Sequence, residues 1–359
     1  FSQEGVQEVS NGSFSQEGSE VSVNGDFALN SSWSGANTIS NGQLIKGSGG
    51  GIVYQGTLDG TIKSYKVVVD VAEKNGVSLN LYLGGNQFAL NEGVQTIYMQ
   101  SGSSNTFLGF NNGADSVINS ISVKEVGQDW TLGTGWSIGE DKAVFDGVSN
   151  ANLSQSNILT NGKQYKLTYE ILENTTTSGY IRLGAETATA ITQLDGAVGT
   201  HEMYFLNDGY TTSFVVRTNS LTGGDFSITN ISVKEVGQDW AFQPKWSIGN
   251  GFAQLISNDS TGSSLIPNTV VISGNKYKCS FDVVINSGFC KLQGSSGTTY
   301  QIIDETKTYN FNFIADSGDI YFNRSSSVSD ITITNISVKE ITDDTNLPRI
   351  NYEGFSYQD

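Results

Sequence analysis

The chain has 359 residues, about twice the length of a typical domain, so we expect two or three domains. Its 19 Lys and Arg against 36 Asp and Glu give a net charge of −17, which argues against nucleic acid or an anionic membrane surface as the main partner. One histidine (His201) and two cysteines (Cys279 and Cys290) exclude a His-rich metal site, a four-cysteine zinc site and a dense disulfide framework. No apolar run approaches the ~20 residues that span a bilayer, so no membrane insertion is expected.

The N-terminal segment carries a short duplication. Phe1-Ser-Gln-Glu-Gly5 returns as Phe14-Ser-Gln-Glu-Gly18, and Val9-Ser-Asn-Gly-Ser-Phe14 is echoed by Val23-Asn-Gly-Asp-Phe27. The simplest account is a slipped duplication of the start of a structural unit, so residues 1–21 are interpreted as an N-terminal connector. Because the chain begins at Phe1 rather than Met, we expect a processed chain or part of a longer one.

A much longer repeat follows. The decapeptide Ile121–Trp130 recurs without change as Ile231–Trp240, and Ile336–Glu340 is a third, shorter copy. A period of this length corresponds to a complete domain, because solenoid repeats run about 20–50 residues. The repeat predicts module 1 at 22–126, module 2 at 127–236 and module 3 at 237–341, with a C-terminal connector at 342–359.

Within each module the apolar residues alternate with a period of two. Lys66–Val71, Ser78–Leu83 and Thr211–Arg217 are typical of strands, rich in β-branched and aromatic residues. Asn-Gly pairs separate the runs, and this dipeptide accepts the positive φ of tight hairpin turns. The pattern predicts an all-β protein of three tandem antiparallel β-sandwich (jelly-roll) domains, arranged as beads on a string.

The closing strand of each module predicts a β-bulge. In Asp330–Lys339 the apolar positions are Ile331 and Ile333, then Ile336 and Val338, so the alternation slips by one residue at Asn335. The same slip falls at Asn230 and at Ser120. A bulge at each slip would keep both halves of the strand facing the core.

The two cysteines are expected to remain unpaired. We expect Tyr277–Ile285 to form one strand and Phe289 onward to form its hairpin partner, which puts Cys290 opposite Val284. Cys279 would then lie ~17 Å further along the hairpin. A disulfide needs Cα atoms within ~7 Å, so the hairpin excludes one.

These motifs resemble a known group of folds. The opening Asn24-Gly-Asp-Phe27 with Trp33, the Tyr65-Lys66 strand and the closing Ile-Ser-Val-Lys-Glu strand are similar to the carbohydrate-binding-module-like jelly rolls of the galactose-binding-like superfamily, nearest to families 4 and 9. Thr229–Glu235, with Asp344–Tyr352 downstream, looks like tandem modules of bacteriophage tail-fibre and other virion proteins. Modules 2 and 3 depart from the family by opening with Gln-Asp-Trp.

The resemblance implies a jelly roll over roughly residues 22–350, used in that group for sugar binding or for plain spacing. It also leaves open a structural calcium ion between an opening acidic residue and one on the final strand. That site would use Asp26 with Asp115, and the repeat-equivalent Asp225 and Asp330, since hard oxygen ligands suit calcium. No other cofactor is required.

No motif in the sequence indicates an enzyme. His201 is the only candidate base for a Ser-His-Asp group, and no Gly-x-Ser-x-Gly nucleophile elbow accompanies it. The acidic residues are numerous enough to give carboxylate pairs by chance, so such pairs do not indicate a glycosidase. Gly47–Gly51 lacks the Lys-Ser/Thr of a phosphate-binding loop. We expect a non-enzymatic protein.

The aromatic residues are the candidate sugar ligands, because pyranose rings stack on flat π surfaces. Trp33, Trp136 and Trp246 follow each module start at a position interpreted as equivalent, where a Trp serves the core or a binding platform. Aromatics that differ between modules fit a variable binding surface better, with arginines as polar partners. These residues are Tyr82, Tyr98, Tyr180, Tyr204, Tyr210, Tyr300 and Tyr321, with Arg182 and Arg217.

Together these observations predict a virion or surface fibre or decoration protein, located outside the cell or on the virion surface. Its modules would present weak sites for cell-surface glycan, whose number raises avidity. A purely structural spacer or filament subunit, and accessory modules of a glycan-degrading enzyme, stay open as alternatives. The expected partners are glycan or other virion or filament subunits in a homo-oligomer.

Overall fold

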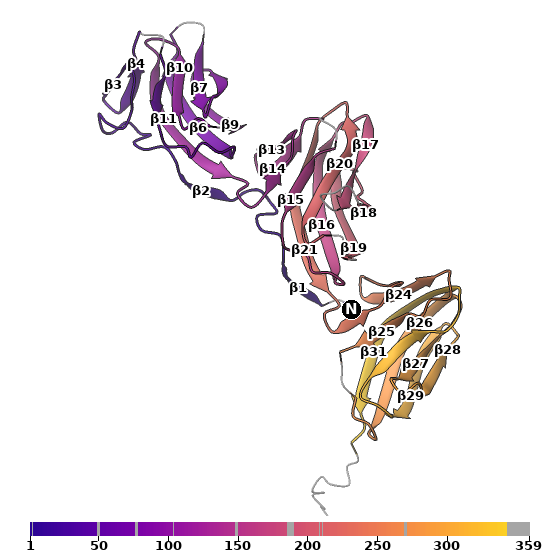
Figure 1. The fold of residues 1–359 in the computed structure, drawn as a ribbon. Coiled ribbons are helices and arrows are strands. Elements are labelled where there is room, and N and C mark those ends of the chain that lie inside the picture. Colours follow the sequence, from indigo (N-terminus) through magenta and orange to yellow (C-terminus); the bar gives the residue numbers. More distant parts are fainter. Residues whose placement is uncertain are drawn as a thin grey trace, which may run out of the picture.

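The computed structural model describes residues 1, 3–48, 51–75, 78–102, 104–147, 150–184, 190–207, 209, 211–268 and 271–342. These residues form 31 strands in six antiparallel sheets. The all-β sandwich class expected from the alternating pattern is confirmed. A search of the described residues for a helix that is long and apolar enough to cross a membrane finds none. Figure 1 shows three lobes of paired sheets following one another along the chain.

Module 1 packs two sheets face to face. Its strands are β2 (Glu17–Glu20), β3 (Asn37–Ser40), β4 (Gln43–Lys46), β5 (Val53–Gln55), β6 (Ser64–Glu73), β7 (Leu79–Leu83), β8 (Asn86–Leu90), β9 (Gly93–Gln100), β10 (Leu108–Asn112) and β11 (Val117–Val126). The first sheet has the order β3-β4-β11-β6-β9, with β2 also paired to β11, and the second has the order β5-β10-β7-β8.

Module 2 repeats this plan. Its strands are β12 (Thr131–Leu132), β13 (Trp136–Gly139), β14 (Lys142–Phe145), β15 (Asn152–Gln155), β16 (Gln164–Asn174), β17 (Ser178–Gly184), β18 (Ala190–Gln193), β19 (Gly199–Leu206), β20 (Phe214–Thr222) and β21 (Phe226–Val236), joined by β1 (Glu4–Gln7). The first sheet is β13-β14-β21-β16-β19 with β1 on β21, and the second is β12-β15-β20-β17-β18.

Module 3 has the same two sheets without an added N-terminal strand. Its strands are β22 (Trp240–Phe242), β23 (Trp246–Gly249), β24 (Phe252–Ser257), β25 (Ser264–Pro267), β26 (Lys276–Ser287), β27 (Cys290–Gly294), β28 (Thr299–Ile303), β29 (Lys307–Ile314), β30 (Ile320–Arg324) and β31 (Ser329–Glu340). Its sheets are β23-β24-β31-β26-β29 and β22-β25-β30-β27-β28.

The core of each module lies between its two sheets. On β6, Val67, Val69 and Val71 are buried while Lys66 and Asp70 face outward, as the side-chain period of two requires. The described residues contain three such apolar clusters, one in each module. Burying each large apolar side chain stabilises the fold by about 1.5–3 kcal/mol, so each module has its own source of stability.

The expected β-bulges are present in the closing strands. Asn230 and Asn335 interrupt the register of β21 and β31 and have φ of +51° and +54°, which confirms the slips in modules 2 and 3. In module 1 the extra residue is Asn119, one position before the expected Ser120. All three asparagines donate a side-chain N–H to a carboxylate on the neighbouring strand: Asn119 to Asp70, Asn230 to Glu170 and Asn335 to Asp282. The asparagine at each bulge thus bonds the closing strand to its neighbour, and in module 1 this asparagine is Asn119 rather than Ser120.

The N-terminal segment is not the connector that the sequence suggested. Residues 3–27, which we call the N-terminal strap, place β1 against β21 of module 2 and β2 against β11 of module 1. Figure 1 shows the strap running beside module 2 towards module 1, with the N-terminus close to module 3. The duplication is thus two donated strands, each of which pairs with a different module.

The expected hairpin between the cysteine strands was also wrong. β26 pairs with β29 and β31 in one sheet, whereas β27 pairs with β28 and β30 in the other. Cys279 and Cys290 therefore reach the core of module 3 from opposite sheets, as buried free thiols. Consecutive strands of a sandwich can cross between its sheets, and the short connection between β26 and β27 gave no signal of that crossing.

Candidate strand-acceptor grooves and ligand-binding faces

The strap is bound to module 2 along the outer edge of β21. The Glu8 N–H donates to the Val233 carbonyl (2.8 Å), and the Ile231 N–H donates to the Gly12 carbonyl (3.0 Å). Glu4 lies between two lysines of module 2, at 2.7 Å from Lys166 and 2.9 Å from Lys234. Backbone hydrogen bonds to β21 and a carboxylate shared by two lysines therefore hold β1 against module 2.

Module 1 binds the strap in the same way, 13 positions later in the sequence. The Val21 N–H donates to the Val123 carbonyl (2.8 Å), and the Ile121 N–H donates to the Gly25 carbonyl (2.8 Å). Glu17 lies 2.6 Å from Lys66 and 2.8 Å from Lys124, the counterparts of Lys166 and Lys234. The match shows that the two strands bind by one shared mode.

Each donated strand ends in an Asn-Gly-x-Phe turn. Asn11 and Phe14 both have left-handed φ, +46° and +57°, and the Phe14 N–H donates to the Asn11 carbonyl (3.1 Å). The ring of Phe14 packs on Trp130 with a centroid distance of 5.0 Å, and the Trp130 indole N–H donates to the Asn11 carbonyl (3.0 Å). Module 2 therefore does have the opening motif of module 1, but the strap supplies it.

The same turn in module 1 corrects the expected equivalence of the tryptophans. Phe27 packs on Trp33 at 5.5 Å, and the Trp33 indole N–H donates to the Asn24 carbonyl (3.2 Å). Trp33 therefore matches Trp130, and both come directly before the residue that pairs with the strand after the first hairpin. Position after the module start had aligned Trp33 with Trp136 instead.

Trp136 and Trp246 form a different pair, at the junctions between modules. Both are buried at the start of an equivalent hairpin. The Gln100 side chain of module 1 donates to the Trp136 carbonyl (3.3 Å), and Gln164 of module 2 donates to the Trp246 carbonyl (3.4 Å). At the Trp136 position module 1 has Asn37. The three tryptophans are thus core or junction residues in this structure.

Electrostatics favour the bound strap. Hydrogen bonds from Lys124 and then Lys66 lower the pKa of Glu17 to about 2. Hydrogen bonds from Lys166 and then Lys234 lower the pKa of Glu4 in the same direction. Both carboxylates are partly exposed to solvent, which limits the strength of each ion pair.

The second sheet of module 2 carries a polar outer face with an aromatic residue. Arg182 and Arg217 are cross-strand neighbours, and Tyr180 pairs with Asn219 in the same two strands. Arg217 donates to the Asn152 side chain (3.4 Å), and Tyr180 is 38% exposed. The structure therefore brings Tyr180, Arg182 and Arg217 together on one face, and their role in binding stays a prediction.

The equivalent face of module 1 is the most aromatic of the three. Tyr54 and Tyr82 flank Gly109 in register, and the Tyr54 ring lies 4.2 Å from that of Phe107. The Asn105 side chain donates to the Tyr82 hydroxyl (3.0 Å). Two tyrosines therefore lie on either side of a residue without a side chain, with the Asn105 amide beside one of them. The sequence reasoning missed Tyr54 and Phe107; the strand alternation that placed Tyr82 outward would also have placed Tyr54.

The other predicted tyrosines divide between two settings. Tyr321 lies on the equivalent face of module 3, paired with Gln293, whereas Tyr300 stacks on Phe313 at 4.5 Å and donates to Asp316. Tyr98 and Tyr204 lie on the first sheets, opposite Lys66 and Lys166, and burial raises the pKa of both. Tyr210 falls outside the described residues, as does Asp344–Tyr352.

The four acidic residues expected to hold calcium act separately in the described structure. Asp26 accepts from the Ala28 N–H (3.3 Å), and Asp330 accepts from Gln254 (3.1 Å) and Asn286 (3.0 Å). The backbones of Asp115 and Asp225 bond Lys46 and Thr175 respectively. Within the described ranges no group of three or more His, Cys, Asp or Glu is placed to hold a metal, and the calcium site stays a prediction.

His201 is engaged in local contacts on β19. Its Nε2 lies 2.7 Å from the Ala197 carbonyl and its Nδ1 lies 3.5 Å from Asp195. The ring also stacks on Tyr169 at 5.1 Å. Both ring nitrogens thus face groups of the segment that joins β18 to β19, and none of these contacts is with a serine nucleophile.

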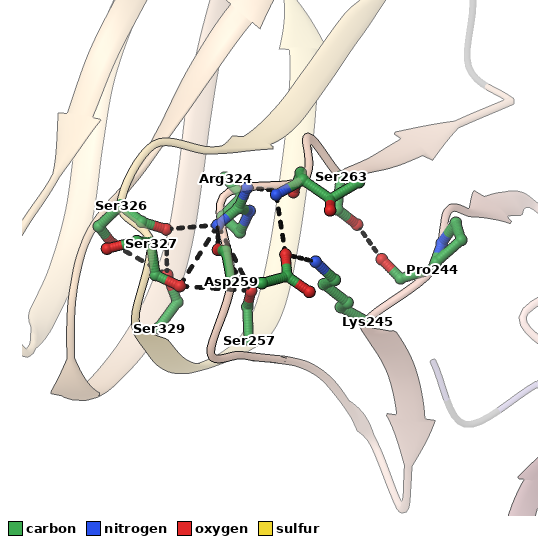
Figure 2. A network of polar contacts seen from close by, with 10 residues as sticks. Pro244, Lys245, Ser257, Asp259, Ser263, Arg324, Ser326, Ser327 and Ser329 are labelled. Carbon is green, nitrogen blue, oxygen red and sulfur yellow. Dashed lines mark hydrogen bonds and ion pairs between the residues drawn. The ribbon is translucent and has the colours of Figure 1, made fainter.

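A buried arginine organises one end of module 3. Arg324 is 9% exposed, and its guanidinium donates to the carbonyls of Asp259, Thr261 and Ser326. Figure 2 shows this group at the centre of a polar network in which Lys245 pairs with Asp259. Arg324 joins the loop after β24 to the loop after β30, which is a structural role.

A cavity lies where modules 1 and 2 meet. Its volume is about 660 Å³, and Lys63, Gln100, Glu125, Trp130 and Trp136 are among its lining residues. Two of the lining residues, Lys63 and Glu125, form an ion pair of 3.0 Å. The cavity is part of the junction between the two modules, away from the aromatic faces.

Comparison with known proteins gives no family. No protein-family model matches the chain, and no curated protein matches it. Among solved structures, the N-terminal CBM22-1–CBM22-2 tandem domain of Paenibacillus barcinonensis Xyn10C aligns over 60% of this chain and 94% of its own, at 9% identity and a TM-score of 0.26.

Two virus structures also align. A chain of the Sulfolobus turreted icosahedral virus structure covers 86% of this chain and 89% of its own, at 14% identity and a TM-score of 0.24. A chain from a structure described as the triple jelly roll fold and turret assembly in an archaeal virus covers 86% and 88%, at 14% identity and a TM-score of 0.20. At TM-scores this low the alignments do not assign the chain to any of these groups.

Proposed function

We propose that this protein is a non-enzymatic structural subunit of an extracellular or virion fibre, in which the strap stiffens a row of jelly-roll modules. The strap is the observation that carries the proposal. It pairs with modules 2 and 1 in turn and returns the chain to the start of module 1. Partners would be further fibre subunits in a homo-oligomer.

The strap gives the junction between modules 1 and 2 a second covalent connection. The first connection is the linker between β11 and β12, which consists of residues 127–130. The second is the strap, in which only residues 15 and 16 separate Phe14 on module 2 from Glu17 on module 1. Modules joined by one linker move relative to each other by default. Two short connections at one junction restrict bending and twisting, as a load-bearing fibre subunit requires.

Electron microscopy of the native material tests the function directly. We expect the chain in a filament or particle appendage, with its modules in a fixed row. Isolation of the native protein as a free molecule, or as part of a catalytic assembly, would overturn the proposal. Small-angle scattering of the purified chain gives a second test. A chain with a disrupted strap should show a broader distribution of overall dimensions than the unaltered chain.

Glycan binding is a second candidate function, favoured by the outer face of module 1. Tyr54 and Tyr82 flank Gly109 with the Asn105 amide beside them, an arrangement suited to stacking a sugar ring while bonding its hydroxyls. A glycan array probed with assembled protein should show signal that Tyr54→Ala and Tyr82→Ala remove. Val94→Ala, at a residue that is 70% exposed on the other sheet of the same module, serves as the control, and an array without signal would refute this candidate.

A further inference from the structure

The closing strand of module 3 has an open outer edge. In modules 1 and 2 the equivalent edge carries β2 and β1. β24 pairs with β31 only as far as Thr334, and no strand of the described residues pairs with Ile336–Lys339 on that side. An unpaired edge with free backbone groups is a template for an added strand.

The apolar residues along this edge are more exposed than their counterparts. Ile121 and Val123 of module 1 are 3% and 0% exposed, whereas Ile336 and Val338 are only half-buried. Trp240, the counterpart of Trp130, is also only half-buried. The donated strands cover these positions in modules 1 and 2, and in module 3 they line a groove of about 280 Å³ with Phe322 and Pro267.

The groove also has the two lysines that bind the donated glutamates. Lys278 and Lys339 are cross-strand neighbours, at the positions of Lys66 and Lys124 in module 1 and of Lys166 and Lys234 in module 2. Neither has an ion-pair partner within the part of the chain that the structure describes. Two adjacent cations at this edge favour a strand with an acidic residue at the position of Glu4.

One element of the missing strand is already in place. Phe1 packs on Trp240 with a centroid distance of 4.9 Å, as Phe14 packs on Trp130 at 5.0 Å. Phe1 therefore fills the aromatic position of the Asn-Gly-x-Phe turn. The extended part of the strand, the counterpart of Glu4–Ser13, is what the groove lacks.

We propose that this groove binds an extended strand from a partner chain, which pairs antiparallel with Ile336–Lys339 as β1 pairs with β21. The partner strand carries a glutamate for Lys278 and Lys339, followed by a glycine, and ends beside Phe1. Both copies of this pattern within the strap are bound to modules 2 and 1, so neither copy is the occupant, and the charge of the two lysines favours an acidic strand from a partner chain. The inference rests on the strap that carries the proposed function.

Binding at module 3 should be weaker than in the other two grooves. Gln55 and Gln155 each accept from the backbone N–H of the donated strand, at Val23 and Ser10 respectively, and donate back to its carbonyl. Pro267 occupies the equivalent end of β25 and has no amide to offer. The partner strand should therefore exchange more readily at module 3 than the donated strands do at modules 1 and 2.

A synthetic peptide with the sequence of residues 3–13 tests the proposal on the full chain. We expect one peptide to bind per chain, measured by calorimetry, and to slow hydrogen exchange at the amides of Ile336 and Val338. A peptide with valine at the position of Gly12 should bind at least about tenfold more weakly, because the Gly12 site leaves no space for a Cβ.

Variants of the chain locate the site. The double variant Lys278→Glu/Lys339→Glu should weaken peptide binding at least about tenfold, whereas Lys74→Glu/Lys291→Glu, with the same change in charge, should not. Absence of binding to both the full chain and a chain ending at Thr342 would overturn the proposal. Binding only to the shortened chain would also overturn it, by showing that residues 343–359 occupy the groove.

Self-association provides the remaining alternative. One outcome is that the purified chain forms oligomers that the double variant Lys278→Glu/Lys339→Glu does not form. That outcome would identify a second copy of this chain as the occupant and would count against a different partner chain. These outcomes are distinct from a failure of the proposed function, because peptide binding at module 3 is measured independently of whether the native chain is found in a fibre.

Discussion

Glu4 and Glu17 make the same pair of contacts on two different modules, each lying between a lysine of the closing strand and a lysine of its neighbour. The 13-residue offset between them equals the offset between Phe1, Phe14 and Phe27, which pack on Trp240, Trp130 and Trp33. The short N-terminal duplication is therefore matched to the long repeat of the modules. The modules provide the grooves, and the N-terminal duplication provides the strands that bind in two of them.

Glycine at position 12 is predicted to be essential for strap binding. A Cβ there would overlap the Ile231 carbonyl oxygen, so Gly12→Val should release the strap from β21 and destabilise module 2 by about 1–3 kcal/mol. Chemical denaturation measures the loss of stability. Hydrogen exchange at the amides of Glu8 and Ile231 shows whether the strap has been released. Gly262→Val is the matched control, because an added Cβ meets nothing there; equal stability of both variants would refute the prediction.

Acid should loosen the strap on module 1. Glu17 has an ordinary pKa of 4.5 and a folded-state pKa of about 2. Because the folded-state pKa is lowered, the ion pairs contribute fully above about pH 4.5 and are lost as the pH falls towards 2. The stability of the wild type should therefore decline over this range more steeply than that of Glu17→Gln, measured by urea denaturation at several pH values. Parallel curves for the two proteins would show that Glu17 does not stabilise the strap.

The aromatic anchor of the strap gives a prediction of larger size. Phe14 is 1% exposed against Trp130, so Phe14→Ala should destabilise module 2 by about 3–5 kcal/mol. Phe14→Leu keeps most of the apolar volume and should lose less. Calorimetric unfolding distinguishes the two, with Val6→Ala as the control because Val6 is 77% exposed. A Phe14→Ala protein as stable as the control would mean that the turn does not anchor the strap.

The fold could be predicted from sequence because its signals are local or literal. Alternation along β6 and the unchanged decapeptide need no knowledge of distant contacts. The strap could not be predicted in this way, since Gln7 meets Ser232 and Val233 across more than half of the chain. Its duplication was visible, but nothing in it indicated that the two copies bind different modules.

The candidate binding residues were predicted less well for a related reason. Alternation shows which residues leave the core, but both sheets of a sandwich have an outer face. Tyr82, Tyr180 and Tyr321 lie on the second sheets, whereas Tyr98 and Tyr204 lie on the first sheets near module junctions. Which sheet a strand joins depends on its pairing with other strands, so the sequence alternation could not separate these two groups of tyrosines.

The cysteines are predicted to be inert in the folded protein. Burial raises the pKa of Cys279 and Cys290 to about 12, so neither thiol ionises near neutral pH, and reaction requires the thiolate. A thiol reagent should therefore label neither residue in native protein and both in denaturant, counted by mass spectrometry. Rapid labelling of native protein would show that module 3 opens readily at its core.

Arg324 is predicted to be the most sensitive polar residue of module 3. Its guanidinium is nearly buried and donates to at least three backbone carbonyls (Figure 2), so Arg324→Met leaves those carbonyls without their donor. We expect a loss of about 2–5 kcal/mol and faster hydrogen exchange in β24 and β30. Arg324→Lys should recover only part of the stability, because one ammonium cannot reach the carbonyls on both loops. Lys291→Met, on the outer face of β27, is the control, and equal stability of Arg324→Met and this control would show that the network does not hold the loops together.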